Sequence, residues 1–161
     1  MTKPPFKAYE GDEPYVFVSY AHADSGMVFR DVDYLHEQGL RIWYDEGIRA
    51  GADWNDRLAV AIKRCQFFLV FVSPNIEGSP WIADEILTAK EHKRPVLAVH
   101  LVETKLSEAL EHQLRRWQHV FRYQHGEDVY YAKLRDLAFL GCEPVRPAGV
   151  ARGAKARRFE R

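Results

Sequence analysis

Phe67-Phe68-Leu69-Val70-Phe71-Val72 is the most hydrophobic run in this sequence of 161 residues. The six apolar residues follow one another without the polar alternation of a half-buried strand. A continuous run of this length is typical of a strand that is buried on both faces. We therefore place a strand at residues 67–72 and interpret the rest of the chain around it.

Four shorter apolar or β-branched runs predict further strands, at residues 15–20, 40–44, 96–101 and 119–123. Segments with helical spacing of apolar residues separate these runs, at residues 24–38, 53–63, 79–92, 106–117 and 127–140. Strands that alternate with helices predict a parallel sheet covered on both faces. With right-handed crossovers, this order gives a doubly wound, flavodoxin-like α/β fold, with a mainly parallel five-stranded sheet flanked by helices.

Individual residues mark the ends of several predicted helices. Gly39 is a natural stop for the first helix, and Gly141 closes the last one. Asp53 is placed to cap the second helix.

Length and composition indicate one globular domain. The hydrophobic fraction is 47%, the charged fraction is 29% and the formal net charge is zero. A neutral chain gives no electrostatic argument for binding nucleic acid or an anionic membrane. Residues 146–161 nevertheless carry six basic side chains against one acidic side chain, a net charge of +5. We interpret residues 1–14 as a flexible leader, residues 15–141 as the domain, and residues 142–161 as a basic linker or tail that leads to a further domain.

Cysteine usage and the lack of targeting segments bear on where the protein acts. Cys65 and Cys142 form neither a disulfide framework nor a metal motif, and both lie in apolar contexts. Such thiols are typical of reduced, packed cysteines in the cytosol. The sequence has no apolar run of about 18 residues, and its N-terminus lacks the apolar core of a signal peptide. We therefore expect a cytoplasmic protein that does not bind a membrane.

The helix after the 67–72 strand opens with the stretch Ser79-Pro80-Trp81-Ile82-Ala83-Asp84-Glu85. Ser79 is a good N-cap, and Pro80 fits the first helical position because its missing N–H is not needed there. Trp81 and Glu85 are four residues apart, so they share one face of this helix. Open α/β sheets bind ligands at the carboxyl ends of their strands, so a carboxylate beside an indole at this place predicts a site.

Three segments in this order resemble the Toll/interleukin-1 receptor (TIR) domain family, and most closely its bacterial, NAD+-consuming members. The segments are residues 15–24, 39–51 and 73–85. They are similar, in turn, to the first box of the family, to its second strand with the so-called BB loop, and to the segment that carries its catalytic glutamate. The resemblance extends over residues 14–141.

The resemblance implies cleavage of the bond between nicotinamide and ribose in NAD+, with Glu85 as the catalytic residue. Such a cleavage passes through an oxocarbenium-like transition state. Nicotinamide leaves as a neutral molecule, so one carboxylate that stabilises the positive ribose is sufficient. Trp81 can wall the site and exclude water, and the helix that begins at Ser79 offers N–H groups that bind anions. NAD+ is a substrate here, so we expect no cofactor, and the histidine spacing indicates no metal site.

Eight further residues are placed around the substrate by the same resemblance. They are Tyr20, Ala21, His22, Trp43, Asp45, Trp54, Ser73 and Ser79. The resemblance also implies self-association through the BB loop, Asp45 to Gly51, and Trp54 is expected to stack on adenine in the assembled site. The alternative for each residue is a purely structural one, with Trp43 in the core and His22 capping a loop.

Two functions are left open. The first is an NAD+ glycohydrolase or cyclase (an NAD+ nucleosidase) that is activated by self-association in bacterial anti-phage immunity, with a fused sensor domain as a candidate partner. The alternative is a non-enzymatic module that recruits other TIR domains, with a virulence factor as its variant. The sequence does not decide whether the product is ADP-ribose, a cyclic isomer or a base-exchange product.

Overall fold

The computed structural model describes residues 3–46 and 53–140 of the chain. Five strands form one parallel sheet in the order β2-β1-β3-β4-β5. The strands are β1 (Val16–Ser19), β2 (Ile42–Tyr44), β3 (Phe67–Val72), β4 (Val96–His100) and β5 (Gln118–Phe121). The predicted flavodoxin-like α/β class is confirmed, and the long apolar run forms the middle strand of the sheet.

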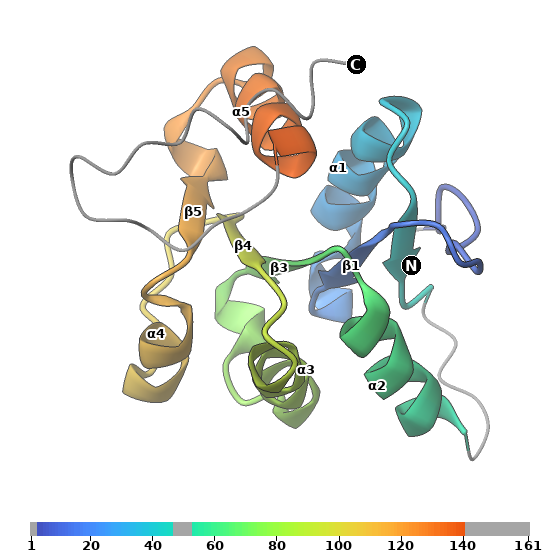
Figure 1. The fold of residues 1–161 in the computed structure, drawn as a ribbon. Coiled ribbons are helices and arrows are strands. Elements are labelled where there is room, and N and C mark those ends of the chain that lie inside the picture. Colours follow the sequence, from blue (N-terminus) through green and yellow to red (C-terminus); the bar gives the residue numbers. More distant parts are fainter. Residues whose placement is uncertain (1–2, 47–52, 141–161) are drawn as a thin grey trace, which may run out of the picture.

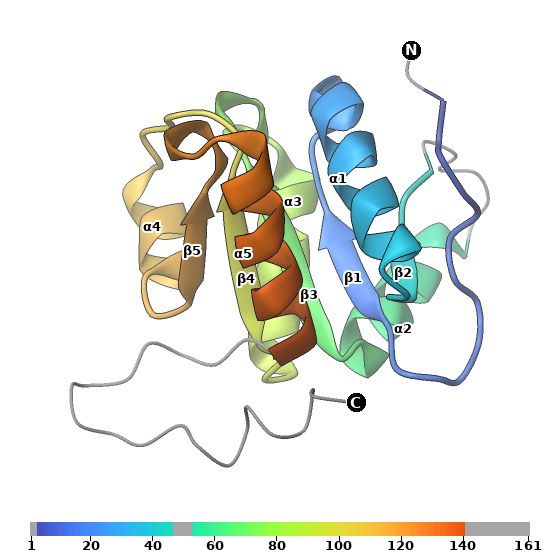
Figure 2. The same ribbon diagram turned by 90° about the horizontal axis from the view of Figure 1, so that it is seen from above.

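Five helices cover the two faces of the sheet (Figure 1). The helices are α1 (Ser25–Glu37), α2 (Trp54–Arg64), α3 (Pro80–Glu91), α4 (Glu108–Leu114) and α5 (Glu127–Leu140). Helices α1 and α5 lie on one face, and α2, α3 and α4 lie on the other, as Figure 2 also shows. All five were predicted, and the largest difference is that α4 is shorter than the predicted 106–117 segment.

Alternate strand residues supply the two cores. Val16 and Val18 pack with α1 and α5, whereas Phe17, between them, packs with α2, α3 and α4. Every residue of β3 is at most 1% exposed, because helices cover the middle strand on both faces. The ring of Phe17 stacks on Trp43 at 4.9 Å and on Phe68 at 5.3 Å, so aromatic contacts join three neighbouring strands.

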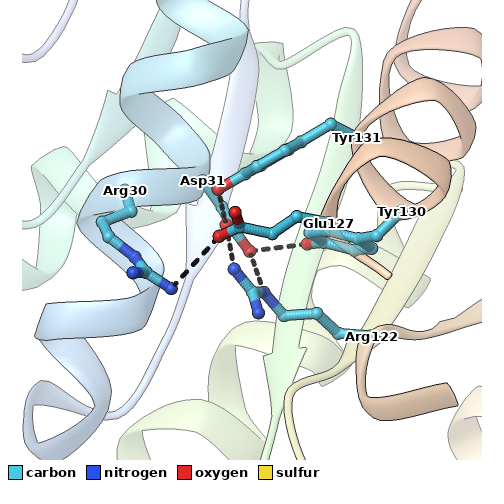
Figure 3. A network of polar contacts seen from close by, with 6 residues as sticks. All are labelled: Arg30, Asp31, Arg122, Glu127, Tyr130 and Tyr131. Carbon is cyan, nitrogen blue, oxygen red and sulfur yellow. Dashed lines mark hydrogen bonds and ion pairs between the residues drawn. The ribbon is translucent and has the colours of Figure 1, made fainter. Parts of the chain in front are cut away.

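A buried polar network fastens α5 to α1 (Figure 3). Asp31 of α1 is fully buried, and its carboxylate accepts two hydrogen bonds from the guanidinium of Arg122, each 3.1 Å long. The hydroxyls of Tyr130 and Tyr131 on α5 donate to the same carboxylate at 2.6 and 2.9 Å. A buried charge needs such partners, so this network fixes the position of α5 against the sheet.

The helix ends follow the predicted residues with one exception. Gly39 adopts a positive φ of 101° just past α1, and Ser79 caps α3 by accepting a hydrogen bond from the Ile82 N–H at 3.4 Å. Asp53 occupies the N-cap position of α2, but its side chain makes no capping hydrogen bond, so the predicted cap is wrong. The predicted stop at Gly141 lies outside the described residues.

The leader makes defined contacts with strand β2. Residues 3–14 form neither helix nor strand, yet the Tyr9 N–H donates to the Ile42 carbonyl at 2.8 Å and the Tyr44 hydroxyl donates to the Phe6 carbonyl. Cys65 is buried, as expected for a packed thiol. Cys142, the basic tail and BB-loop residues 47–51 lie outside the described residues. Among the helices described, none has both the length and the apolar character needed to span a membrane.

Candidate active site

Buried polar side chains gather at the carboxyl edge of the sheet. Ser19 and His100 end β1 and β4, while Asp45 and Ser73 directly follow β2 and β3. All four are at most 6% exposed. Parallel strands end at one edge, so segments far apart in the sequence place polar groups on the same rim. This is the edge at which the sequence predicted a site.

Glu85 lies at a cavity of about 180 Å³ between α2 and α3. Its side chain is only 5% exposed, between the buried Ile82 and Ile86 of the same helix. Trp81, one turn earlier on α3, lines the same cavity and is 50% exposed. The predicted pairing of carboxylate and indole on one helix face is confirmed, and the carboxylate is buried rather than solvated.

Helix α2 supplies the opposite wall of this cavity. Four residues on one face of the helix line it: Asn55, Leu58, Ala59 and Ile62. Three of them present apolar surface, and Asn55 adds an exposed amide at the first turn. The helical spacing of Leu58, Ala59 and Ile62 predicts an apolar face on α2, but this face was not among the predicted site residues. Their spacing of three and four residues marks a helix face, but it does not reveal which neighbouring helix that face meets.

Tyr20, His22 and Asp45 form a second cluster at the ends of β1 and β2. The Tyr20 hydroxyl donates to the Asp45 carbonyl, and the His22 Nε2 lies 3.0 Å from the Asp45 carboxylate. The rings of Tyr20 and His22 are 5.3 Å apart. Asp45 is buried whereas the His22 side chain is 46% exposed, so the imidazole is held by a buried carboxylate and still reaches solvent. The neighbouring Ala21 is half-buried against the α2 and α3 core.

Ser73 and Ser79 hold the loop between β3 and α3. The Ser73 hydroxyl donates to Asp24 at 2.5 Å and accepts from the Asn75 N–H at 3.0 Å. The Asn75 amide also donates to Asp24, at 2.8 Å. The Ser79 hydroxyl caps α3. Both serines were predicted to contact substrate; in this structure their hydroxyls fix the approach to α3, and neither lines the Glu85 cavity.

Trp43 and Trp54 lie on a different side of α2 from Trp81. Trp43 is 8% exposed, stacks on Phe17 and lies 5.9 Å from the Trp54 ring. It lines a separate cavity of about 340 Å³ between the leader and α2, not the cavity of Glu85. Of the ten predicted site residues, Trp81 and Glu85 line this Glu85 cavity within the described part of the chain, and the other eight do not.

His100, which ends β4 at the same edge, forms a pair with His119 of β5. His119 donates from Nε2 to the Leu114 carbonyl at 2.9 Å, so its Nδ1 accepts from the Nε2 of His100, 2.8 Å away. Burial, together with the neighbouring imidazole, lowers the pKa of His100 to about 4. Within the described residues, no group of histidine, cysteine and acidic side chains is arranged to bind a metal.

Comparison with known proteins identifies the family. The family model described as "TIR domain" matches residues 16–137, which is most of the chain. The chain therefore belongs to the TIR-domain family. A search of curated proteins found no match.

Solved structures of several kinds share the fold. The TIR domains of the activated Roq1 resistosome, which recognises the pathogen effector XopQ, are 19% identical over 78% of this chain and 74% of theirs, with a TM-score of 0.50. The CMP N-glycosidase BcmB of Clostridium botulinum is 19% identical over 74% of this chain and 97% of its own, with a TM-score of 0.52. A diflavin flavoprotein A3 from Nostoc sp. is 12% identical over 78% and 89%, also with a TM-score of 0.52. At these identities the likeness concerns the fold alone.

Proposed function

We propose that this TIR domain is an NAD+ glycohydrolase or cyclase and that Glu85 is its catalytic residue. The observation that carries the proposal is the Glu85 carboxylate, 5% exposed at a cavity rimmed by Trp81. A buried negative charge is costly to maintain, and such charges are retained where chemistry uses them. The fold neighbour BcmB, named as an N-glycosidase, supports the same class of bond cleavage.

The reaction breaks the bond between ribose C1′ and the pyridine nitrogen. Its electron pair returns to the ring, so nicotinamide leaves neutral and the ribose becomes an oxocarbenium-like cation. The Glu85 carboxylate stabilises this cation from a site that is largely shielded from water. In hydrolysis, a water oxygen then bonds to C1′ and releases one proton, giving ADP-ribose. In cyclisation, an adenine nitrogen takes the place of water.

Cavity size supports activation by self-association. Sites for ligands of this kind usually occupy at least about 300 Å³, whereas the Glu85 cavity measures about 180 Å³. The described residues of one copy therefore enclose only part of a dinucleotide at this cavity, and the remainder needs a further surface. We propose that an assembled form of the protein supplies this surface, with BB-loop contacts (Asp45 to Gly51) and adenine stacking by Trp54.

If assembly completes the site, NAD+ cleavage is expected to rise more steeply than linearly with protein concentration. A rise in activity proportional to protein concentration would contradict control by assembly.

Product analysis tests the enzymatic function. Concentrated protein is incubated with NAD+, and nicotinamide, ADP-ribose and cyclic products are quantified by mass spectrometry. Glu85→Gln keeps the shape of the side chain and removes its charge, so nicotinamide release is expected to fall by at least about a hundredfold, a loss typical for one stabilising group. Glu91→Gln is the matched control, since Glu91 is exposed at the end of the same helix. Equal activity of the wild type and Glu85→Gln would refute the proposed catalysis.

The division of the predicted site residues favours a second candidate. Tyr20, His22 and Asp45 form their own cluster, outside the cavity that holds Glu85. A non-enzymatic module that recruits other TIR domains, with a virulence factor as its variant, needs such a rigid cluster at Asp45, where the BB loop begins, and no cavity. If Glu85→Gln preserved biological output while changes at Ile48 or Arg49 abolished it, this candidate would replace the enzyme.

A further inference from the structure

Residues 6–13, termed the strap, run along the open edge of the sheet at β2 (Figure 2). The Tyr9 N–H bonds to the Ile42 carbonyl, and the Ala8 N–H donates to Glu46 at 3.3 Å. These contacts cover part of an edge strand that would otherwise present unpaired backbone groups. The strap thus covers the sheet edge without becoming a regular strand.

Three ion pairs join the strap, which also carries the basic Lys7, to the surface beneath it. The strap supplies three carboxylates and the surface supplies three guanidinium groups. Their nitrogen–oxygen distances are 3.0 Å for Glu10–Arg57, 3.2 Å for Asp12–Arg64 and 3.5 Å for Glu13–Arg41. Arg57 and Arg64 come from α2, and Arg41 immediately precedes β2. The structure therefore shows which partner this surface, termed the arginine edge, accepts: an extended acidic segment.

The ion pairs hold the strap only weakly, and its other contacts are those of Phe6, Ala8 and Tyr9. All six charged side chains are between 40% and 95% exposed. Exposed ion pairs contribute at most about 1 kcal/mol each and are screened by salt. A cavity of about 340 Å³, lined by Tyr9 and Tyr15 among others, lies between the strap and α2, so packing beneath the strap is incomplete. Pro14 follows the strap and favours an extended conformation at Glu13, which suits a hinge.

When the strap leaves the arginine edge, the three arginine charges of that surface determine which segment can bind there. Two bare edges cannot pair with each other, because each presents Arg41, Arg57 and Arg64, and like charges repel. A second copy of the chain does carry one complementary segment, its own strap. We propose that two copies of this protein exchange straps, so that the strap of each copy binds the arginine edge of the other. The exchange is reciprocal and closes as a two-fold dimer.

This inference concerns assembly and does not depend on NAD+ cleavage. The exchanged dimer makes the same contacts as the monomer, so the tethered strap competes at an effective concentration on the order of millimolar. The wild-type chain is therefore expected to dimerise only at high concentration. Once binding within one chain is blocked, the same contacts are available only between chains, and dimerisation should shift to lower concentration.

Two complementary variants separate exchange from binding within one chain. The strap variant carries Glu10→Arg, Asp12→Arg and Glu13→Arg. The edge variant carries Arg41→Glu, Arg57→Glu and Arg64→Glu. Each variant alone repels its own strap and is expected to sediment as a monomer. In an equimolar mixture, both straps match the edge of the other chain, so a mixed dimer should form at a concentration at least about tenfold below that of the wild type. Raising the salt to about 1 M should dissolve it.

The control exchanges the charges of Arg30 and Glu127, an exposed pair 3.8 Å apart on α1 and α5, and should leave association unchanged. A mixture that stays monomeric while both variants keep the wild-type circular dichroism spectrum and melting temperature would overturn the proposal.

A cross-linking experiment tests the exchange even if one of the charge-reversed variants fails to fold. Chains with Glu10→Cys and chains of different mass with Arg57→Cys are mixed and treated with a short thiol cross-linker. Cys142 is replaced by serine in both, and Cys65 is unreactive because burial raises its pKa to about 12.

Exchange predicts a cross-link between the two kinds of chain that increases with concentration. One chain carrying both cysteines serves as the positive control for the geometry. A cross-link in that doubly substituted chain, without any between the mixed chains at the same concentrations, would overturn the exchange. NAD+ cleavage is not measured in either experiment, so failure here and failure of the proposed catalysis are distinguishable.

Discussion

Glu85 and Trp81 have opposite relations to solvent although they share one face of α3. The carboxylate is 5% exposed and the indole is 50% exposed. A charged side chain in the interior runs against the usual distribution of residues and costs stability, whereas a half-exposed indole is common. Together they define the charge and the wall of one small cavity. At the scale of single residues, these two are the strongest argument for chemistry in this protein.

Replacing Trp81 should impair substrate binding with little effect on folding. Trp81→Ala removes a half-exposed ring, so we expect a loss of less than about 1 kcal/mol in the free energy of unfolding. Without the wall, KM for NAD+ is expected to rise about tenfold, which corresponds to roughly 1.4 kcal/mol of binding. Leu87→Ala is the control, because Leu87 is 42% exposed on the same helix but does not line the cavity. A similar rise of KM in both variants would contradict a specific role for Trp81.

The two serine caps separate helix stability from catalysis. Ser79 accepts a hydrogen bond from Ile82 at 3.4 Å, and Ser107 accepts one from Leu110 at 3.3 Å. Each substitution by alanine should lower the free energy of unfolding by about 1 kcal/mol in urea titrations. Only Ser79→Ala should also slow NAD+ cleavage, because Ser79 fixes the start of the helix that carries Glu85. Comparable losses of activity in both variants would mean that stability alone is responsible.

Helix α2 links two cavities at the scale of secondary structure elements. One of its faces lines the Glu85 cavity, and another lines the cavity beneath the strap. The opposite face of the sheet is held differently, since α1 and α5 are joined through the buried Asp31 carboxylate and its three partners. The burial of Tyr131 and the charge of Asp31 raise the pKa of that phenol to about 12, so it stays protonated and donates at physiological pH.

Removing Asp31 should be among the most damaging single changes in the domain. Asp31→Leu leaves the Arg122 guanidinium without its partner in a partly buried position, so we expect a loss of about 3 to 5 kcal/mol. Asp31→Leu combined with Arg122→Met removes both charges and should cost less than Asp31→Leu alone. Chemical denaturation measures both values. Glu127→Gln at the exposed Arg30 pair should change stability by less than about 0.5 kcal/mol. A double variant no more stable than Asp31→Leu would contradict this account.

The parallel sheet determines the arrangement of the whole molecule. All five strands end at one edge, and that edge gathers His22, Asp45, Ser73 and His100 from segments of the chain that follow or end four different strands. The amino ends of α2 and α3 begin at the same edge (Figure 1), and Glu85 lies in the second turn of α3. A buried neutral histidine at this edge makes the stability of the fold sensitive to pH.

Acid should destabilise the wild type through His100. The folded-state pKa of His100 is about 4, below its ordinary value of 6.5, so the unfolded chain binds the proton more readily. The contribution of neutral His100 to the free energy of unfolding is therefore complete above about pH 6.5 and is lost as the pH falls toward about 4. Between about pH 7 and pH 5 the loss should approach 2 kcal/mol, and His100→Gln should remove this part of the pH dependence. Thermal melts across this range measure it, with the exposed His112→Gln as control. Identical profiles for wild type and His100→Gln would exclude His100 as the cause.

Much of the fold, and the pairing of Trp81 with Glu85 in the candidate site, were predictable because their signals are local. The continuous run at β3, the cap at Ser79 and the Gly39 stop each depend on a few adjacent residues. The four-residue spacing of Trp81 and Glu85 is equally local. Asp53 shows the limit of such reasoning, since a residue type suited to capping occupies the cap position without making the bond. Trp43, predicted to contact substrate, lines a different cavity from Glu85, and no local pattern in the sequence indicates which cavity its ring reaches.

The sequence by itself determined the order of strands and helices, the central strand and the helix face that presents Glu85. Only the tertiary structure decided that the Glu85 carboxylate is buried, that a face of α2 closes its cavity, and that the strap meets the arginines of α2 and Arg41, which precedes β2. The physical reason is the separation along the sequence over which each interaction acts. Periodicity and capping act between neighbours in the chain, whereas burial and ion pairing arise when packing brings together segments that the sequence separates by tens of residues.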